Sequence, residues 1–229
     1  MTAVIDRVRG KIVSYDERRG VVQIEAPYED FAAMCRREYK EVEITMLDSR
    51  PLSDKQRKSC YAMLREIAVW SGYEPDEIKD MMKFNFIASL VEDMNQFSLS
   101  DAPMSLVAAF QTFLARFIVS HDVPTRRPML DYVDDVQDYV YTCLVNKKCP
   151  ICGKKADLHH YENIGAGRNR DTIIHEGMEV LPLCREHHTE IHTIGRDTFM
   201  KKYHLGNGGI VCDKTICKIY GLNARRRAG

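Results

Sequence analysis

Residues with metal-binding side chains are concentrated in one segment of this 229-residue chain. Six of the eight histidines and three of the eight cysteines lie between positions 149 and 192. Thiolate and imidazole bind transition metals well, and a bound metal can stabilise a segment that has only a small core. These ligands are more numerous than the four that a tetrahedral zinc ion accepts. We therefore expect two metal sites, one closed and structural, the other open and catalytic.

The closed site is indicated by two pairs of ligands with zinc spacing. Cys149 and Cys152 are separated by two residues and followed by Gly153, as in a tight turn that presents two thiolates. Cys184 and His187 repeat this spacing where a helix is expected to begin. Four protein ligands complete a tetrahedron and leave no position for a substrate. We expect this set to bind a structural zinc.

The open site is indicated by His159, His160, His188 and His192. His188 and His192 are four residues apart, so on a helix they share a face and can bind one ion. His159 and His160 are adjacent, and in a strand adjacent side chains point to opposite faces. One of these two can therefore bind the metal while the other acts as a base on a water molecule. Phosphodiester hydrolysis requires this combination.

Together these residues resemble the HNH endonuclease family, whose fold is a ββα-metal module. The resemblance covers roughly residues 147–203 and rests on Asp157-Leu158-His159-His160, Leu183-Cys184 and His188-x-x-x-His192. It implies a hairpin that carries the first histidine pair and a helix from about Arg185 that carries the second. It also implies site roles: His160 as general base, a catalytic metal at His159, His188 and His192, and zinc at Cys149, Cys152, Cys184 and His187.

The chain departs from the family pattern at one position. The family usually has an asparagine a few residues before the Leu-Cys step, where this chain has Glu179. Glu179, His175 and Asn163 are the candidates to replace it, either by orienting the base or by completing the metal shell. The change can alter metal preference or activity. Imidazoles accept Mn²⁺, Ni²⁺ and Zn²⁺ more readily than Mg²⁺, so the catalytic ion is left open among Mg²⁺, Mn²⁺ and other divalent metals.

Basic residues near the metal ligands suit a polyanionic substrate. The net charge of the chain is zero, but residues 141–229 contain 15 Lys and Arg against 9 Asp and Glu. Arg168 and Arg170 lie in a glycine-containing loop after the first histidine pair, and guanidinium groups suit phosphate oxygens. We expect these two arginines to contact the DNA backbone. A solvated surface loop is the alternative.

The part before the metal ligands predicts a mixture of strands and helices. Strands are expected at residues 10–15, 20–25 and 41–46, and helices at 28–39, 53–71 and 77–84. A further helix follows residues 98–100, and a connecting helix is expected at 130–145. The predicted fold class is α+β: an N-terminal mixed domain (1–125), a linker helix (126–146) and a C-terminal ββα-metal (HNH) module with a structural zinc (147–229).

Residues 42–123 resemble the bacteriophage NinB/Orf family of recombination mediators. The resemblance rests on the helix start at residues 54–58, Asp-Lys-Gln-Arg-Lys, and on the order of the elements. It implies that Lys55, Arg57 and Lys58 contact single-stranded DNA and that the protein is a homodimer. It also implies a phage recombinase or a single-strand-binding protein as a partner.

Two main hypotheses follow, from different functional classes. The first is a phage metal-dependent DNA endonuclease of recombination, whose N-terminal domain brings the HNH module to single-stranded or branched DNA. The second is a non-catalytic, single-stranded-DNA-binding mediator whose C-terminal module is only stabilised by zinc. A zinc-dependent adaptor is a third, but it leaves the histidine pairs unexplained. The sequence has no secretory-signal layout and no apolar run of roughly 20 residues, so we expect a phage protein in the host cytoplasm and no membrane contact.

Overall fold

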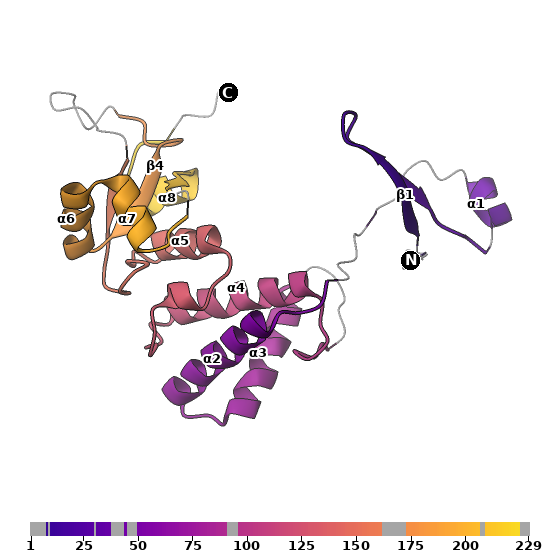
Figure 1. Cartoon of the computed structure of the whole chain (residues 1–229), viewed down its shortest axis with the longest axis horizontal. Helices are drawn as coiled ribbons and strands as arrows, with labels where there is room; N and C mark the ends of the chain where they lie inside the picture. The colour runs from indigo at the N-terminus through magenta and orange to yellow at the C-terminus, as the bar shows by residue number, and fades with distance from the viewer. Residues whose placement is uncertain are drawn as a thin grey trace. The chain divides into compact units, whose positions relative to one another are not determined.

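The computed structural model describes residues 8, 10–29, 31–37, 44, 50–90, 96–161, 173–206 and 209–224. The chain divides into two compact units, Met1–Leu47 and Asp48–Gly229 (Figure 1). Both mix helices with small antiparallel sheets or hairpins, which confirms the α+β class. Within the described ranges, every helix is too short or too polar to cross a bilayer.

The first unit contains a β-hairpin and a short helix. Strands β1 (Lys11–Asp16) and β2 (Val21–Glu25) pair antiparallel, and α1 (Phe31–Arg37) follows. The turn is held by the Asp16 carboxylate, which accepts hydrogen bonds from the backbone N–H groups of Arg18 and Arg19. These elements confirm the two strands and the helix predicted for this part. The strand predicted at 41–46 lies outside the described residues, apart from Ile44.

Three helices form the first part of the second unit: α2 (Asp54–Ser71), α3 (Pro75–Ser89) and α4 (Met104–Ser120). The predicted start of α2 is confirmed, because Ser53 and Gln56 exchange the two hydrogen bonds of a capping box. Gly72 ends the helix at φ 79°, a backbone conformation that favours glycine. α3 begins two residues earlier than expected, since Pro75 occupies its first turn, where the missing N–H costs nothing.

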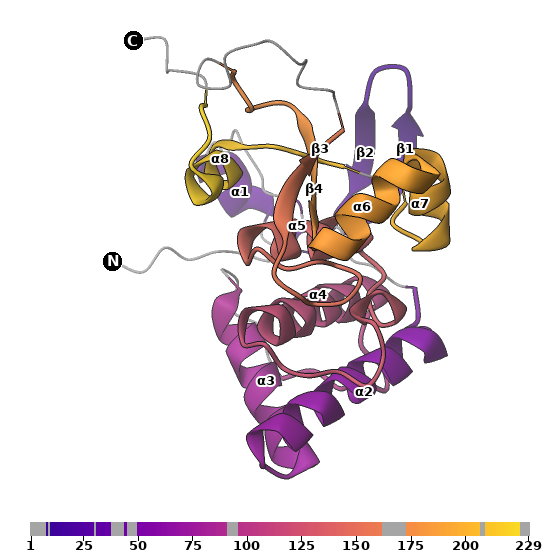
Figure 2. The same ribbon diagram turned by 90° about the vertical axis from the view of Figure 1, so that its left-hand side faces the viewer.

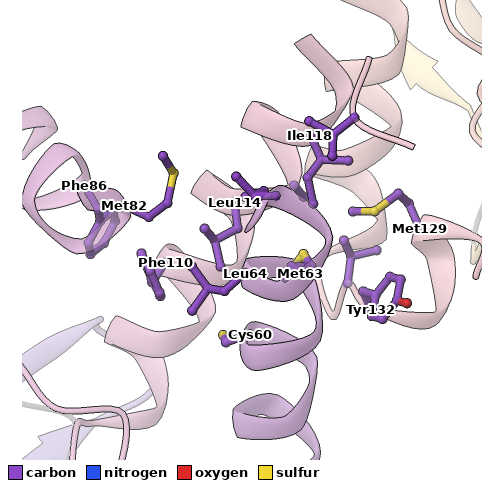
Figure 3. Packing of buried hydrophobic residues seen from close by; sticks show 14 of the residues in the cluster. Cys60, Met63, Leu64, Met82, Phe86, Phe110, Leu114, Ile118, Met129 and Tyr132 are labelled. Atoms are coloured by element: carbon purple, nitrogen blue, oxygen red, sulfur yellow. The ribbon is translucent and has the colours of Figure 1, made fainter. Parts of the chain in front are cut away.

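A shared hydrophobic core holds these three helices together (Figures 2 and 3). Met63 and Leu64 of α2 pack with Phe110 and Leu114 of α4, and Phe86 of α3 lies 5.3 Å from Phe110 between ring centroids. Met63, Phe110 and Leu114 have no exposed area. The apolar spacing of α4 therefore faces the core, as its sequence pattern predicts.

The predicted connecting helix over 130–145 is correct only in its second half. A 3-10 turn, η1 (Met129–Asp131), comes first, and α5 (Val136–Val145) begins after Asp135, whose carboxylate accepts from the Asp138 N–H. Gln111 of α4 donates a side-chain hydrogen bond to the carbonyl of Tyr132, which lies in the non-helical segment between η1 and α5. α5 packs against α4, β4 and α8, so it is a buried element between them.

The C-terminal part has a three-stranded antiparallel sheet in the order β3-β4-β5. β3 (Asp157–His160) and β4 (Glu179–Leu183) form a hairpin, and β5 (Ile210–Val211) adds a short edge. Three helices surround it: α6 (Arg185–Ile194), α7 (Arg196–Lys202) and α8 (Lys214–Tyr220). The predicted hairpin and the helix from Arg185 are confirmed, whereas β5, α7 and α8 were not predicted.

The register of this hairpin separates the adjacent histidines. His159 is opposite Leu181, and His160 is opposite Val180. Leu181 belongs to a core cluster with residues of α6 and α7, whereas Val180 belongs to a cluster with residues of β5 and α8. Cross-strand partners share a face of the sheet. His159 therefore lies on the α6 face and His160 on the α8 face.

Candidate active site

The four residues of the closed set meet at one point between a turn and a helix start. The ligand atoms of Cys149, Cys152, Cys184 and His187 all lie within 4.8 Å of one another. The first two come from the turn that follows α5. Gly153 has a φ of 69° there and donates its N–H to the Cys149 carbonyl. The other two come from the first turn of α6, where Cys184 is the N-cap residue.

The distances within this set match the edges of a zinc tetrahedron. Zn–S bonds of about 2.3 Å and Zn–N bonds of about 2.0 Å give tetrahedral edges of about 3.8 Å between sulfurs and about 3.5 Å between sulfur and nitrogen. Cys152 Sγ lies 3.6 Å from Cys184 Sγ and 3.7 Å from His187 Nδ1. Cys149 Sγ lies 3.4 Å from the same nitrogen. The donor set and its spacing fit one tetrahedral ion.

Burial favours the neutral form of these thiols when no cation is bound. It raises the pKa of Cys152 to about 12 and also raises the pKa of Cys149. A metal binds the thiolate, so binding must release these protons, and the charge of the ion reverses the effect of burial. Because burial disfavours the thiolate, the charged form of this set requires a bound cation.

The open set lies between β3 and α6. His159, on the strand, is 7% exposed, and its ring centroid is 4.8 Å from that of His188 and 5.0 Å from that of His192. His188 and His192 are one helical turn apart, with ring centroids separated by 5.1 Å. One ring nitrogen from each residue lies within 4.8 Å of the other two. Three convergent imidazoles can hold a divalent ion and leave positions for water or phosphate.

Two of the three imidazoles, those of His159 and His188, lie in an environment that favours the neutral form that binds a metal. Burial, followed by the charges of His188 and His192, lowers the pKa of His159 to about 4. Burial also lowers the pKa of His188. A neutral imidazole has a free lone pair, and mutual repulsion prevents the rings from all becoming charged. The cluster is therefore suited to bind a cation.

His160 faces a different partner on the other side of the hairpin. Its Nε2 shares a 2.9 Å hydrogen bond with Nδ1 of His175. The backbone of His175 is fixed by two further hydrogen bonds, because its N–H donates to the Asn223 carbonyl and its carbonyl accepts from the Met178 N–H. Burial lowers the pKa of both histidines. The two rings thus form a neutral pair.

Glu179, another of the three candidates for the missing asparagine, has different contacts. Its Oε2 accepts a 2.8 Å hydrogen bond from Arg196, whose guanidinium lies 3.9 Å above the Tyr161 ring. Alternate residues of a strand share a face, so Glu179 lies on the Leu181 side of β4 and away from His160. This geometry favours His175 over Glu179 as the residue that orients His160.

The remaining candidate residues fall into two groups. Arg168, Arg170 and Asn163 lie outside the described residues. Lys55, Arg57 and Lys58 lie in the first turns of α2, where Lys55 is 3.4 Å from Asp134 and Arg57 pairs with Asp54. The contact between Tyr161 and Arg196 is not predicted from the sequence. Gly209 lies so close to the Tyr161 ring that any Cβ at this position would collide with it, and the sequence around either residue carries no signal of this contact.

Comparison with known proteins identifies the family. The family model described as "Putative HNHc nuclease" matches residues 21–223, which include both ligand clusters and most of the chain. No curated protein and no solved structure matches the chain. A nuclease family of this type implies DNA as the substrate and a metal ion in the reaction. The chain belongs to this HNH nuclease family.

Proposed function

We propose that this protein is a metal-dependent DNA endonuclease that uses His160 as the general base. The observation that carries the proposal is the arrangement around β3. Three imidazoles converge on one face of the hairpin, and a hydrogen-bonded histidine pair lies on the other face, one residue away. Phosphodiester hydrolysis needs both a cation site and a nearby base.

His159, His188 and His192 fit a divalent ion by donor type, number and convergence. When bound, such an ion supplies electrostatic stabilisation of the charge that develops on the phosphate and the leaving oxygen. The protein contributes the fixed positions of the three rings. β3 holds one of them, and a single face of α6 holds the other two.

The hydrogen bond to His175 determines which nitrogen of His160 is free to act. For His160 to accept a proton at Nδ1, its Nε2 must carry hydrogen and donate it to Nδ1 of His175. In this tautomer the Nδ1 lone pair is available to a water molecule. After proton transfer, the same hydrogen bond stabilises the imidazolium. His175 is then a positioning residue that takes the role of the missing asparagine.

The closed set has a separate role in the proposal. Cys149, Cys152, Cys184 and His187 hold a structural zinc that fixes the start of α6 against the turn after α5. Because α6 also carries His188 and His192, this zinc sets the position of two ligands of the open site. The zinc therefore contributes to activity through geometry alone.

The test is a nicking assay on supercoiled DNA with Mg²⁺ or Mn²⁺. His160→Ala should lower the rate by about 10²- to 10⁴-fold, the usual contribution of a general base. His121→Ala is the matched control, since His121 is an exposed histidine at the end of α4 outside both clusters. Equal rates for the wild type and His160→Ala would reject this assignment.

Three finer parts of the proposal rest on the resemblance to NinB/Orf mediators. They are the role in phage recombination, homodimer formation and contacts of Lys55, Arg57 and Lys58 with single-stranded or branched DNA. The non-catalytic mediator is the competing function. It predicts single-strand binding without nicking in any divalent metal, and a single tightly held zinc per chain.

A further inference from the structure

A basic cleft lies between α2 and the chain that follows α4. It has a volume of about 600 Å³ and is separate from both metal-ligand clusters. Its cationic lining residues are Lys55, Lys58, Arg65, Arg126 and Arg127. Two carboxylates, Glu66 and Asp131, also line it, so the lining carries a formal excess of three positive charges.

Glu66 joins the two walls of the cleft, α2 and the segment of residues 126–132. Its side chain is 8% exposed, and Oε1 accepts hydrogen bonds from the Arg126 backbone N–H at 3.2 Å and from the Tyr132 hydroxyl at 3.3 Å. Both partners belong to the segment that forms the opposite wall. The buried carboxylate therefore fixes the loop with Arg126 and Arg127 against α2.

Three of the cationic side chains in the lining are exposed to solvent and are not paired with a carboxylate in the described part of the chain. They are those of Lys58, Arg65 and Arg127. Lys55 lies 3.4 Å from Asp134, so its charge is partly balanced. Like charges that line a concave surface repel one another and raise the local concentration of anions. Such a cleft favours a polyanion.

The composition of the lining indicates which part of a nucleic acid it fits. Ammonium and guanidinium groups suit phosphate oxygens. The aromatic ring in the lining, that of Tyr132, is 7% exposed, and its hydroxyl is used by Glu66. A base would therefore find no open ring to stack on. Contacts to phosphates, without reading of bases, are what this surface offers.

The same loop extends the basic surface toward the zinc-binding turn. Arg126 and Arg127 also line a neighbouring cleft of about 510 Å³. Its other wall includes Cys149, Cys152 and Gly153. The cations thus continue from α2 to the edge of the module that carries the proposed nuclease site.

We propose that the cleft between α2 and residues 126–132 binds the phosphate backbone of the DNA substrate away from the bond that is cut. The proposal rests on the proposed function in one respect, that the polyanion is DNA. The cleft anchors the strand independently of sequence, and the HNH module acts on it. Lys58, Arg65 and Arg127 are the principal contacts.

The test measures DNA binding in a background that cannot cut. The His160→Ala protein carries in addition either Lys58→Gln with Arg65→Gln, in the cleft, or Lys79→Gln with Arg116→Gln, outside it. Each pair removes two positive charges from the three-helix part of the second unit, and neither Lys79 nor Arg116 lines the cleft. Fluorescence anisotropy of a labelled oligonucleotide, single-stranded or duplex, is followed across a salt series.

The cleft pair should weaken binding by about 25- to 60-fold at 0.1 M salt. Each phosphate contact contributes a salt slope of about 0.7 for single strands or about 0.9 for duplex, so two contacts make the slope shallower by about 1.4 to 1.8. The control pair should change neither quantity. Equal effects of the two pairs would overturn the proposal. So would displacement of the oligonucleotide by thymidine triphosphate at equal affinity, since the cleft would then be a nucleotide site.

This result is separable from the test of the nuclease. Cleft-dependent binding with no nicking by the wild type would reject the proposed catalysis and support the cleft. Nicking by the wild type with binding that ignores the cleft would reject the cleft and support the catalysis. The substituted side chains in the cleft are exposed, and those of the control pair lie outside the hydrophobic core, so both variants are expected to fold.

Discussion

The hydrogen bond between His160 and His175 leads to the sharpest prediction. Replacing His175 by alanine removes the acceptor that lies 2.9 Å from His160 Nε2. Hydrogen bonds to charged groups contribute about 1.5–3 kcal/mol. His160 becomes charged only when it has accepted the proton, so the hydrogen bond to His175 reaches this strength only then. Because the loss falls on the transition state, kcat should drop by about 10- to 150-fold while KM changes little.

Asparagine supplies the matched variant for this position. Asn Oδ1 and His Nδ1 are both bonded to Cγ, so His175→Asn keeps an acceptor close to the place of the original nitrogen. We expect this variant to retain a rate within about fivefold of the wild type, which corresponds to a loss below about 1 kcal/mol. It also restores the residue type that the family usually has in this region.

The assay is single-turnover nicking with saturating protein and Mn²⁺, together with zinc content and thermal unfolding for each variant. His175 is buried, so His175→Ala is also expected to lose some stability. His175→Asn controls for that loss. The reasoning is refuted if His175→Ala cuts at the wild-type rate, or if both variants are slowed equally while remaining folded.

Three further predictions concern stability. Cys184→Ala should release one zinc and unfold the C-terminal module at a lower temperature, whereas Cys35→Ser, at an exposed thiol, should not; elemental analysis and calorimetry measure both. Phe110→Ala should lower the free energy of unfolding by about 3–5 kcal/mol and the exposed Phe84→Ala by far less, as denaturant titration would show. Because the folded-state pKa of His159 is depressed to about 4, the metal-free protein should lose stability as pH falls from about 6.5 toward 4. His159→Gln should reduce that loss by about 2–3 kcal/mol at pH 4.5, and an unchanged pH dependence would contradict the assigned pKa.

Local signals in the sequence were sufficient to predict several elements, including those that carry the metal ligands. The four-residue spacing of His188 and His192 predicts a shared helical face, and Ser53 predicts the start of α2; the structure has both. Such features depend on neighbours along the chain, which a sequence displays directly. The turn with Cys149 and Cys152 is likewise predicted from neighbouring residues alone.

Features that depend on distant contacts were not accessible in the same way. The non-helical chain before Asp135 is bonded at Tyr132 to Gln111, which is 21 residues away in the sequence. His175 was one of three candidates in sequence, and only the folded hairpin brings it to His160. Arg126 and Arg127 fall at the start of the linker predicted for residues 126–146, although Glu66 fixes their loop to α2. In each case a tertiary contact overrides or selects among local patterns.

The most direct test of the open catalytic site is anomalous scattering from crystals soaked in Mn²⁺. We predict a manganese peak bonded to His159, His188 and His192, with the other coordination positions occupied by water or phosphate and none by a fourth protein ligand. A zinc peak should appear separately within the cysteine set. A manganese ion enclosed by four protein ligands, or no peak among the three imidazoles, would contradict the open catalytic site.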